Sequence, residues 1–396
     1  MKRHAPYWLL AIEIVGVVVF AAAYRSLDHY IYWLGGQAVT DGTQLYGERH
    51  SGLWFTNTPF LAVLFAPMSE LPLTAARMAW QSAAVAAFAW ACVSALRLAG
   101  RRPTGRTVAA AVALGLLLEP VWHTLFLGQV NLFLLALVLA DVRRVSEGRR
   151  AGLGIGVAAA IKITPAIFVV LLLAAGRVRA AMTAAGAFVL CTAAAYLVNP
   201  DASRLYWSHT FYDTSRLGVP YISNQSPYAA AVRILGGVDE VGAWYQAVPL
   251  VLGVLGLAVA AAWARRGDWL AAAAVTGVTG LLVSPISWSH HWVWALPALA
   301  VLVRAGDRIP ALGGFLLLLL APPWWTPRDG GPDEYGFHGV LTAVANSYLL
   351  AGLAFLLLMA VRLRTRAASE PPLRLPAPRI ANGGGPLGRK ENAVQP

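Results

Sequence analysis

Charged residues are scarce in this chain of 396 residues. They make up 13% of it, whereas hydrophobic residues make up 58% and the mean hydropathy is +0.59. Soluble globular domains usually carry about 25% charged residues. This deficit, together with apolar runs of about 20 residues, excludes an ordinary soluble domain and predicts a polytopic membrane protein.

Acidic residues are fewer than basic ones, which leaves a formal net charge of +12. A basic balance is also typical of proteins that bind nucleic acid. Here the arginines stand in short clusters between apolar runs, a pattern that sets the orientation of helices in a bilayer. We therefore expect membrane lipids, and no nucleic acid, as partners.

Only two cysteines are present, Cys92 and Cys191, and both lie inside predicted spans among small and apolar residues. We expect them to be packing residues, not a disulfide or a metal pair. No other cysteine or histidine lies at a spacing typical of a zinc site. The adjacent His290 and His291 would point ~100° apart on a helix, so they would not both ligate one metal from it. The sequence predicts no metal site and no cofactor.

The apolar runs predict an all-α polytopic membrane protein of about 11–12 transmembrane helices, short or re-entrant ones included. The first run, 7–25, follows a basic N-terminus and is interpreted as a retained span that starts in the cytoplasm. The others are at 73–97, 107–126, 131–141, 151–176, 181–198, 244–264, 269–286, 292–304, 309–325 and 338–361. The basic clusters between runs all become cytoplasmic only if 151–176 is a hairpin with its tip at "IKITP".

Two long polar segments, 26–72 and 199–243, then share the outer face of the membrane. We expect one membrane-embedded domain over residues 1–366. The tail at 367–396 is rich in Pro and Gly and has no apolar periodicity, which predicts a disordered cytoplasmic segment.

Polar residues are costly within a bilayer unless they are paired or hydrated, so those near the outer face are informative. Asp28 stands just past the first span and could be a solvated boundary residue. Asn57, ahead of Pro59 in "FTNTPFLAVLFAPM", fits a helix cap. Gln129 and Asn131 in "LGQVN" could join helices by hydrogen bonds. All of these positions also suit contact with a polar substrate.

Lys162 is one of three lysines, and the others, Lys2 and Lys390, lie near the termini. Its neighbours are "GVAAAI" and "ITPAIF", and a cation in such surroundings needs an anion nearby. The anion could be one of the few carboxylates of the spans, in a structural ion pair, or the phosphate of a substrate. The residues alone leave both open.

The stretch "SPISWSHHWVWALP" (284–297) places His290 and His291 among three tryptophans. A histidine beside tryptophan at a membrane interface is often structural. With two of them, one could face a cleft and donate to an anion. Trp288, Trp292 and Trp294 suit the interfacial belt and also suit stacking on a sugar ring.

Six segments, in order along residues 5–365, carry a resemblance to a known family: "LDHYIYWLGGQAVTDGTQLYG", "FTNTPFLAVLFAPM", "LGQVNLFLLALVLAD", "AAIKITPAIFVVLLL", "SNQSPYAAAVR" and "LLVSPISWSHHWVW". The sequence resembles the actinobacterial polyprenol-phosphate-mannose-dependent mannosyltransferases of glycosyltransferase family 87. The resemblance implies the GT-C type of membrane fold. It also implies a polyprenyl-phosphate sugar donor, a glycolipid or lipoglycan acceptor, inversion, and an α-(1→2) linkage made outside the plasma membrane, without a cofactor.

The resemblance implies a set of site residues as well. Asp28 matches the general base of this fold, and the family's outer-loop histidine matches His290 or His291, with His291 preferred. Lys162 is a candidate for the donor phosphate. The other substrate-binding candidates are Gln129, Asn131, Asn57, Asn224, Gln225 and Trp288.

Two other functions stay open at this point. Related membrane transferases use a polyprenyl-phosphate arabinofuranose donor. A transporter of lipid-linked sugars would also explain broken helices and a buried lysine, although no internal repeat is evident. The acceptor can be a phosphatidylinositol mannoside, a lipomannan or lipoarabinomannan branch, or a protein glycan.

Overall fold

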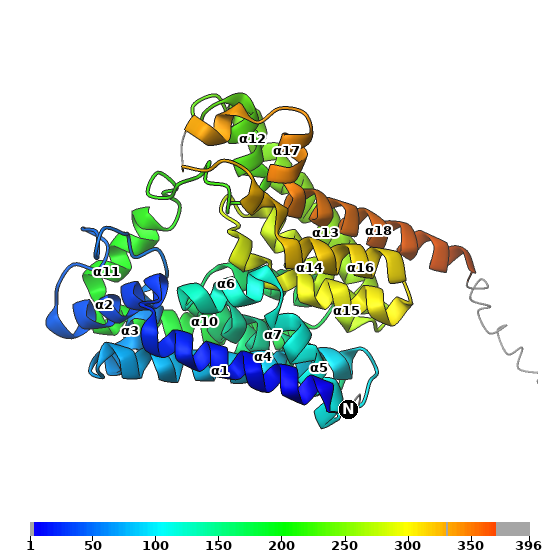
Figure 1. The fold of residues 1–396 in the computed structure, drawn as a ribbon, viewed down its shortest axis with the longest axis horizontal. Helices are drawn as coiled ribbons and strands as arrows, with labels where there is room; N and C mark the ends of the chain where they lie inside the picture. Colours follow the sequence, from blue (N-terminus) through cyan, green and yellow to red (C-terminus); the bar gives the residue numbers. More distant parts are fainter. Residues whose placement is uncertain (1–3, 330–331, 370–396) are drawn as a thin grey trace, which may run out of the picture.

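A computed structural model describes residues 4–329 and 332–369, and this part of the chain is helical, without a β-strand. Figure 1 shows the arrangement. The α-helices are α1 (Ala5–Ala23), α2 (Leu27–Asp41), α3 (Pro59–Ser69), α4 (Leu73–Leu98), α5 (Gly105–Leu116), α6 (Glu119–Leu127), α7 (Asn131–Ser146), α8 (Leu153–Ile161), α9 (Ile167–Ala174), α10 (Val178–Val198), α11 (Pro200–Leu205), α12 (Pro227–Leu235), α13 (Ala247–Arg265), α14 (Trp269–Val283), α15 (Ala295–Ala305), α16 (Arg308–Leu320), α17 (Val340–Ala345) and α18 (Ser347–Ser369). Short helices of other types are η1 (Thr164–Ala166), η2 (Tyr206–Thr210), η3 (Ala243–Gln246), η4 (Ser289–Trp294), η5 (Pro322–Trp325) and η6 (Pro332–Gly336).

Five helical segments among the described residues are long and apolar enough to cross a membrane: Ala5–Ala23, Leu73–Leu98, Val178–Val198, Ala243–Arg265 and Ser347–Thr365. Helices α5 and α6 form a bent pair whose axes differ by 75°, which is the geometry of either a broken span or a re-entrant loop. The bend falls before Pro120, whose ring excludes the helical conformation at a preceding turn. The predicted all-α membrane architecture is therefore confirmed, although several predicted spans are shorter helices.

The segment 151–176 is broken in the middle, as the basic residues at both of its ends predict. Helix α8 ends at Ile161; the next residue, Lys162, has an extended backbone, and η1 with Pro165 precedes α9. The hydroxyl of Thr58 donates to the carbonyl of Ile161, at 3.1 Å, and to that of Ala160. Two backbone carbonyls in the last turn of α8 therefore receive a hydrogen bond from outside the helix. Residues 151 and 176 line one hollow, which is the geometry of a hairpin.

The predicted outer segments contain more helix than their polarity suggests. Segment 26–72 includes α2 and α3, and segment 199–243 includes α11 and α12. In Figure 1, α2, α3 and α11 gather at the end of the molecule opposite the N-terminus, while α12 and α17 lie together above. The expected single domain over residues 1–366 stays a prediction. Most of the predicted tail, from residue 370, lies outside the described residues.

Helix α14 forms the centre of the bundle, with 13 of its 15 residues buried. It contains no charged residue, and a helix that is apolar or small on every side is stable only inside a protein or a bilayer. It packs against α13, α15 and α18, and η4 follows directly after it. The core helix thus fixes the position of the segment that carries His290 and His291.

Two local predictions are wrong. The N-cap residue of α3 is Thr58 and not Asn57, although Pro59 does take the first helical position. Trp292 and Trp294 do not form an interfacial belt, because both are buried and pack against Tyr348 and Phe168. The buried face of η4 and α15 requires large apolar side chains at these two positions, whereas Trp288 is half-buried.

Candidate active site

The carboxylate of Asp28 is held by a chain of hydrogen bonds at the start of α2. The side-chain amide of Gln129 donates to Asp28 Oδ2 at 2.7 Å, and its carbonyl oxygen accepts from the Tyr32 hydroxyl at 2.7 Å. Tyr32 stands one helical turn after Asp28, so the first and last side chains of this series of hydrogen bonds both come from α2. Because the tyrosine fixes the amide, the donor side of Gln129 faces the carboxylate.

Gln129 reaches this position because the chain turns sharply after α6. Gly128 ends that helix in the left-handed region, with φ 75°. A Cβ atom at Gly128 would lie 2.5 Å from Cβ of His29, so a side chain does not fit here. Gly128 therefore allows the backbone to pack closely against His29, and Gln129, the next residue, contacts Asp28.

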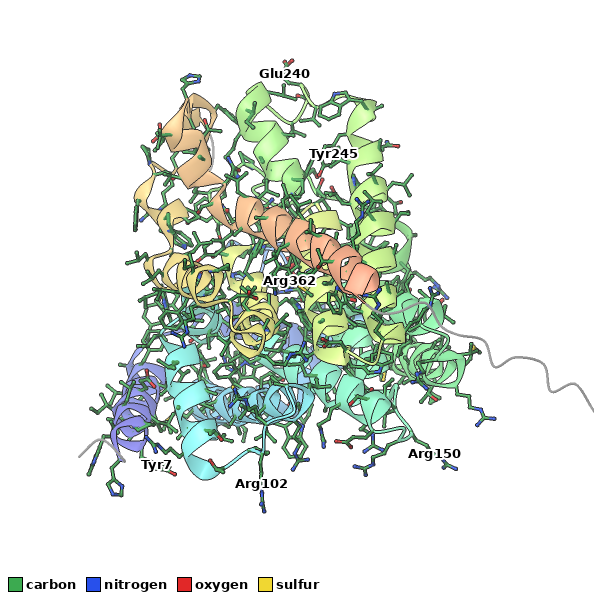
Figure 2. All side chains as sticks on the ribbon, turned by 90° about the vertical axis from the view of Figure 1, so that its right-hand side faces the viewer. Tyr7, Arg102, Arg150, Glu240, Tyr245 and Arg362 are labelled. Carbon is green, nitrogen blue, oxygen red and sulfur yellow. The ribbon has the colours of Figure 1, made fainter. Side chains whose placement is uncertain are left out.

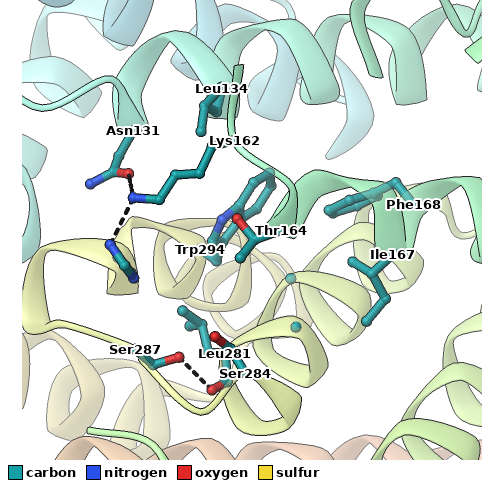
Figure 3. Close-up of a pocket in the computed structure, with 13 residues that line it drawn as sticks. Asn131, Leu134, Lys162, Thr164, Ile167, Phe168, Leu281, Ser284, Ser287 and Trp294 are labelled. Atoms are coloured by element: carbon teal, nitrogen blue, oxygen red, sulfur yellow. Dashed lines mark hydrogen bonds between the residues drawn. The ribbon is translucent and has the colours of Figure 1, made fainter. Parts of the chain in front are cut away.

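The second part of the site contains Lys162, His291 and Asn131, and Figure 3 shows the side chain of Lys162 pointing toward Asn131. Lys162 Nζ lies 2.8 Å from His291 Nε2 and 3.4 Å from Asn131 Oδ1. The amide of Asn131 also donates to the backbone carbonyl of His290 at 3.0 Å. Asn131 thus joins α7 to η4 and supports the lysine as well.

The ionisation of these groups is set by burial and by their mutual charges. Burial raises the pKa of Asp28, although the Gln129 hydrogen bond and the Lys162 charge oppose this. Lys162 lies in the break between α8 and η1, where burial lowers its pKa to about 8, opposed by the Asp28 charge. Lys162 and Asp28 therefore lie close enough for each to favour the charged form of the other.

The expectation that one of the two histidines donates to an anion stays a prediction, and the surroundings of both rings set their ionisation. Burial, with Lys162 as a further cause, holds the pKa of both His290 and His291 well below the ordinary value. Since an ammonium only donates, Nε2 of His291 accepts from Lys162. His290 is buried, and its ring stands edge-on to that of His291 with centroids 4.7 Å apart.

A cavity of about 20 Å³ lies behind Lys162, lined also by Thr164, Ser284 and Ser287. This volume holds about one water molecule and is too small for a sugar.

Sequence reasoning missed a buried polar cluster around Glu119. Its Oε1 lies 2.8 Å from His123 Nδ1 and accepts from Ser289 at 2.7 Å and from Trp324 at 3.0 Å, and its Oε2 accepts from Tyr348 at 3.1 Å. The His123 ring lies edge-on to His290, with centroids 5.3 Å apart. The signal in the sequence was a carboxylate and a histidine at i and i+4 inside an apolar run.

The remaining candidates lie around this centre in supporting positions. The amide of Asn224 bonds to the backbone of Val219, Pro285 and Ser287. That of Gln225 bonds to Ile222, Ala345 and Tyr348. These bonds join the 219–226 segment to its neighbours, and contact of either amide with a substrate stays a prediction.

Trp288 and Asn57 also stand near the centre. Trp288 forms a backbone bridge with Asn224 and packs edge-on against Tyr221. The backbone oxygen of Asn57 accepts from the Tyr46 hydroxyl, and its buried side chain lies near that of Tyr32. Trp288 and Asn57 therefore lie beside Asn224 and Tyr32, respectively.

Within residues 4–329 and 332–369, no three His, Cys, Asp or Glu side chains gather in a way that could hold a metal ion. Both cysteines are free there. The expectation that the reaction needs no metal stays a prediction.

Comparison with known proteins gives this geometry its context. The sequence profile of glycosyltransferase family 87 matches residues 55–285. The chain belongs to this family. It is 33% identical over 375 residues to the polyprenol-phosphate-mannose-dependent alpha-(1-2)-phosphatidylinositol mannoside mannosyltransferase of Mycobacterium tuberculosis H37Rv, covering 85% of this chain and 84% of that protein.

Two further relatives are polyprenol-phosphate-mannose-dependent alpha-(1-2)-phosphatidylinositol pentamannoside mannosyltransferases. That of Mycolicibacterium smegmatis is 33% identical, over 83% of this chain and 85% of its own length. That of Mycobacterium tuberculosis CDC 1551 is 32% identical, over 90% and 84%. No solved structure matches the chain. The resemblance found in the sequence is confirmed, and this family 87 member is a glycosyltransferase with several membrane helices.

Proposed function

We propose that this family 87 enzyme transfers mannose from a polyprenyl-phosphate mannose donor to a phosphatidylinositol mannoside, forming an α-(1→2) linkage with inversion. The names of its relatives support the donor, the acceptor and the linkage. The observation that carries the mechanism is that Asp28 and Lys162, which come from distant parts of the chain, both contact the short segment 129–131: Gln129 donates to Asp28 at 2.7 Å, and Lys162 lies 3.4 Å from Asn131.

Asp28 is the general base. An acceptor hydroxyl is a poor nucleophile at neutral pH, and a carboxylate within hydrogen-bond reach can accept its proton as the new C–O bond forms. The Gln129 amide holds Asp28 Oδ2, which leaves the other carboxylate oxygen for the acceptor. The hydroxyl attacks the anomeric carbon from the face opposite the phosphate, which inverts that centre.

Lys162 stabilises the leaving group. The bond between the anomeric carbon and the phosphate oxygen breaks, and negative charge grows on the departing polyprenyl phosphate. A preorganised cation at that oxygen lowers the barrier, and such a group typically raises the rate by ~10²–10³-fold. His291 and Asn131 occupy two of the three donor directions of the ammonium, so one direction remains for phosphate.

The site faces the outer side of the plasma membrane. The arginines at both ends of 151–176 support this orientation, because basic segments favour the cytoplasmic side. Helices α7 and α8 separate these arginines from Asn131 and Lys162 by their full lengths. Lipid-linked donors suit the outer side, where nucleotide sugars are absent.

The test uses the purified chain with polyprenyl-phosphate mannose and a panel of mannosylated phosphatidylinositols, with product linkage determined by NMR. Wild type should form an α-(1→2)-mannoside, and Asp28→Asn should lose at least ~10²-fold in rate while remaining folded. Asp41→Asn, which changes an exposed carboxylate of the same helix, is the matched control and should keep its activity. Turnover only with the arabinofuranose donor, or near-normal rates for Asp28→Asn, would refute the proposal, and donor movement across vesicles without product would indicate a transporter.

A further inference from the structure

A hollow of about 1180 Å³ lies at the ends of α7 and α8 that are farthest from the candidate active site. Five arginines line this basic hollow: Arg144, Arg149, Arg150, Arg177 and Arg179. Arg144 lies in the last turn of α7, Arg149 and Arg150 in the loop that follows it, and Arg177 and Arg179 at the start of α10. All except Arg144 are exposed. Figure 2 shows Arg150 pointing away from the ribbon, at the end of the molecule that also carries Arg102.

The positive charge of the basic hollow is only partly neutralised by the protein. The carboxylate of Asp141 lies in the hollow, but its Oδ2 accepts from the backbone N–H groups of Gly152 and Ile155, each at 2.9 Å. Glu147 pairs with Arg149 at 3.4 Å. Within the described part of the chain, Arg150 and Arg179 form no salt bridge, so they are available to an external anion.

The walls of the basic hollow are apolar. Leu153 and Val178 line it, and these side chains are 63% and 55% exposed. Orientation in a membrane requires only that basic residues lie on one side of it, and does not require an apolar wall beside them. Arginines next to exposed apolar side chains match a ligand that has an anionic head and hydrocarbon chains.

We propose that the basic hollow binds an anionic phospholipid from the membrane leaflet on this side of the protein. The lipid phosphate lies between Arg150 and Arg179, and an acyl chain lies along Leu153 and Val178. Basic pockets between membrane helices bind acidic headgroups by this combination of charge and apolar contact. The site is distinct from the proposed donor and acceptor sites and does not depend on the proposed function.

The packing beneath the hollow gives this lipid a structural effect. Cβ atoms built on Gly152 and Gly156 would lie 2.2 Å from the carbonyl oxygens of Ala180 and Ala184, so α8 and α10 are in backbone contact. A phosphate bridging Arg150 and Arg179 connects the segment that precedes α8 to the first turn of α10. Bound lipid should therefore raise the thermal stability of the protein.

The experiment compares lipids retained by the full chain, using native mass spectrometry and thermal unfolding with added phosphatidylglycerol or phosphatidylcholine. Wild type should retain phosphatidylglycerol preferentially and gain stability from it. In the double variant Arg150→Gln/Arg179→Gln, the preference for phosphatidylglycerol over phosphatidylcholine should fall by about tenfold or more. The reason is that each arginine near the membrane surface favours the binding of an anionic lipid. The matched control Arg308→Gln/Arg364→Gln removes two exposed charges that do not line the hollow, and it should behave as wild type.

A second variant and a soluble anion separate a lipid from a free phosphate. Leu153→Gln should weaken retention of phosphatidylglycerol, and tripolyphosphate should stabilise the wild type less than the lipid does. The proposal is overturned if both lipids are retained equally, if the control double variant loses as much as the test variant, or if tripolyphosphate stabilises as strongly as phosphatidylglycerol.

Discussion

The ammonium nitrogen of Lys162 lies 2.8 Å from Nε2 of His291, although 129 positions of sequence separate the two residues. The imidazole accepts this hydrogen bond and is therefore neutral, in agreement with a pKa held well below its ordinary value by burial and by the Lys162 charge. His291 positions the cation and does not supply one. This relationship predicts that the lysine, and not the histidine, sets the alkaline limit of activity.

The first prediction concerns that limit. Because burial lowers the pKa of Lys162 to about 8, the ammonium loses its proton, and kcat/KM should fall, as the pH rises through about 8. Arginine keeps its charge to much higher pH, so Lys162→Arg should be slower than wild type but lack this fall. The measurement is kcat/KM across the neutral and alkaline range. An alkaline limb that persists unchanged in Lys162→Arg would contradict the assignment.

A second prediction concerns the hydrogen bond from Gln129 to Asp28. This bond favours the ionised carboxylate and opposes the rise in the pKa of Asp28 that burial causes. Gln129→Leu should therefore raise that pKa further, shift the acidic limb of kcat/KM to higher pH, and lower the plateau rate by about tenfold. Tyr32→Phe removes the bond to Gln129 but leaves the bond to Asp28, so its effect should be smaller. An acidic limb that does not move in Gln129→Leu would rule out this role.

The sequence predicted the features that depend on hydrophobic length and on isolated charges. The break at Lys162 was predictable because a hairpin was the only solution that kept both basic ends of 151–176 on one side. Asp28, Gln129 and Lys162 were found because a polar side chain near the membrane needs a partner. The expectation that these three residues lie together came from the resemblance to the family and from assigning each loop to one side of the membrane.

Features that depend on tertiary packing could not be predicted in this way. Trp292 and Trp294 suit a membrane interface by composition, but the fold places η4 against the buried helix α14 and so buries them. Glu119 and Arg233 are buried charges, and each has a partner more than 100 positions away in sequence, Tyr348 and Asn346 respectively. Sequence patterns that reflect neighbours along one helix do not contain this information.

A third prediction concerns stability. Arg233 is buried and donates to the backbone carbonyls of Pro220 and Asn224, at 3.1 and 3.0 Å, and to Asn346. Arg233→Met would leave these acceptors unsatisfied, which should lower the free energy of unfolding by about 3 kcal/mol. Thermal unfolding in detergent measures the loss. The exposed Arg328, which donates to the carbonyl of Trp324, is the control: Arg328→Met should change the stability by less than about 1 kcal/mol. Equal stability of the two variants would show that the buried bonds contribute little.

The last prediction concerns Glu119, which is fully buried and holds the segment carrying His290 and His291. Its carboxylate accepts from Ser289, which directly precedes the two histidines, and from Trp324 and Tyr348. A glutamine at this position would turn an N–H₂ group toward at least one of these donors, so Glu119→Gln should shift η4 and weaken the contact of His291 with Lys162. We expect kcat to fall by about 10- to 100-fold with little change in KM, because the displaced groups act on the leaving phosphate in the transition state.

Tyr348→Phe is the matched control for Glu119, since it removes one donor at 3.1 Å and leaves the carboxylate with its other partners. Its kcat should fall by less than about threefold, in keeping with the modest net value of one hydrogen bond. Steady-state kinetics with polyprenyl-phosphate mannose, and the alkaline limb set by Lys162, separate positioning from a general loss of structure. If Glu119→Gln lowers only the fraction of folded protein, with an unchanged kcat per folded molecule, then Glu119 contributes to stability alone and the positioning role is wrong.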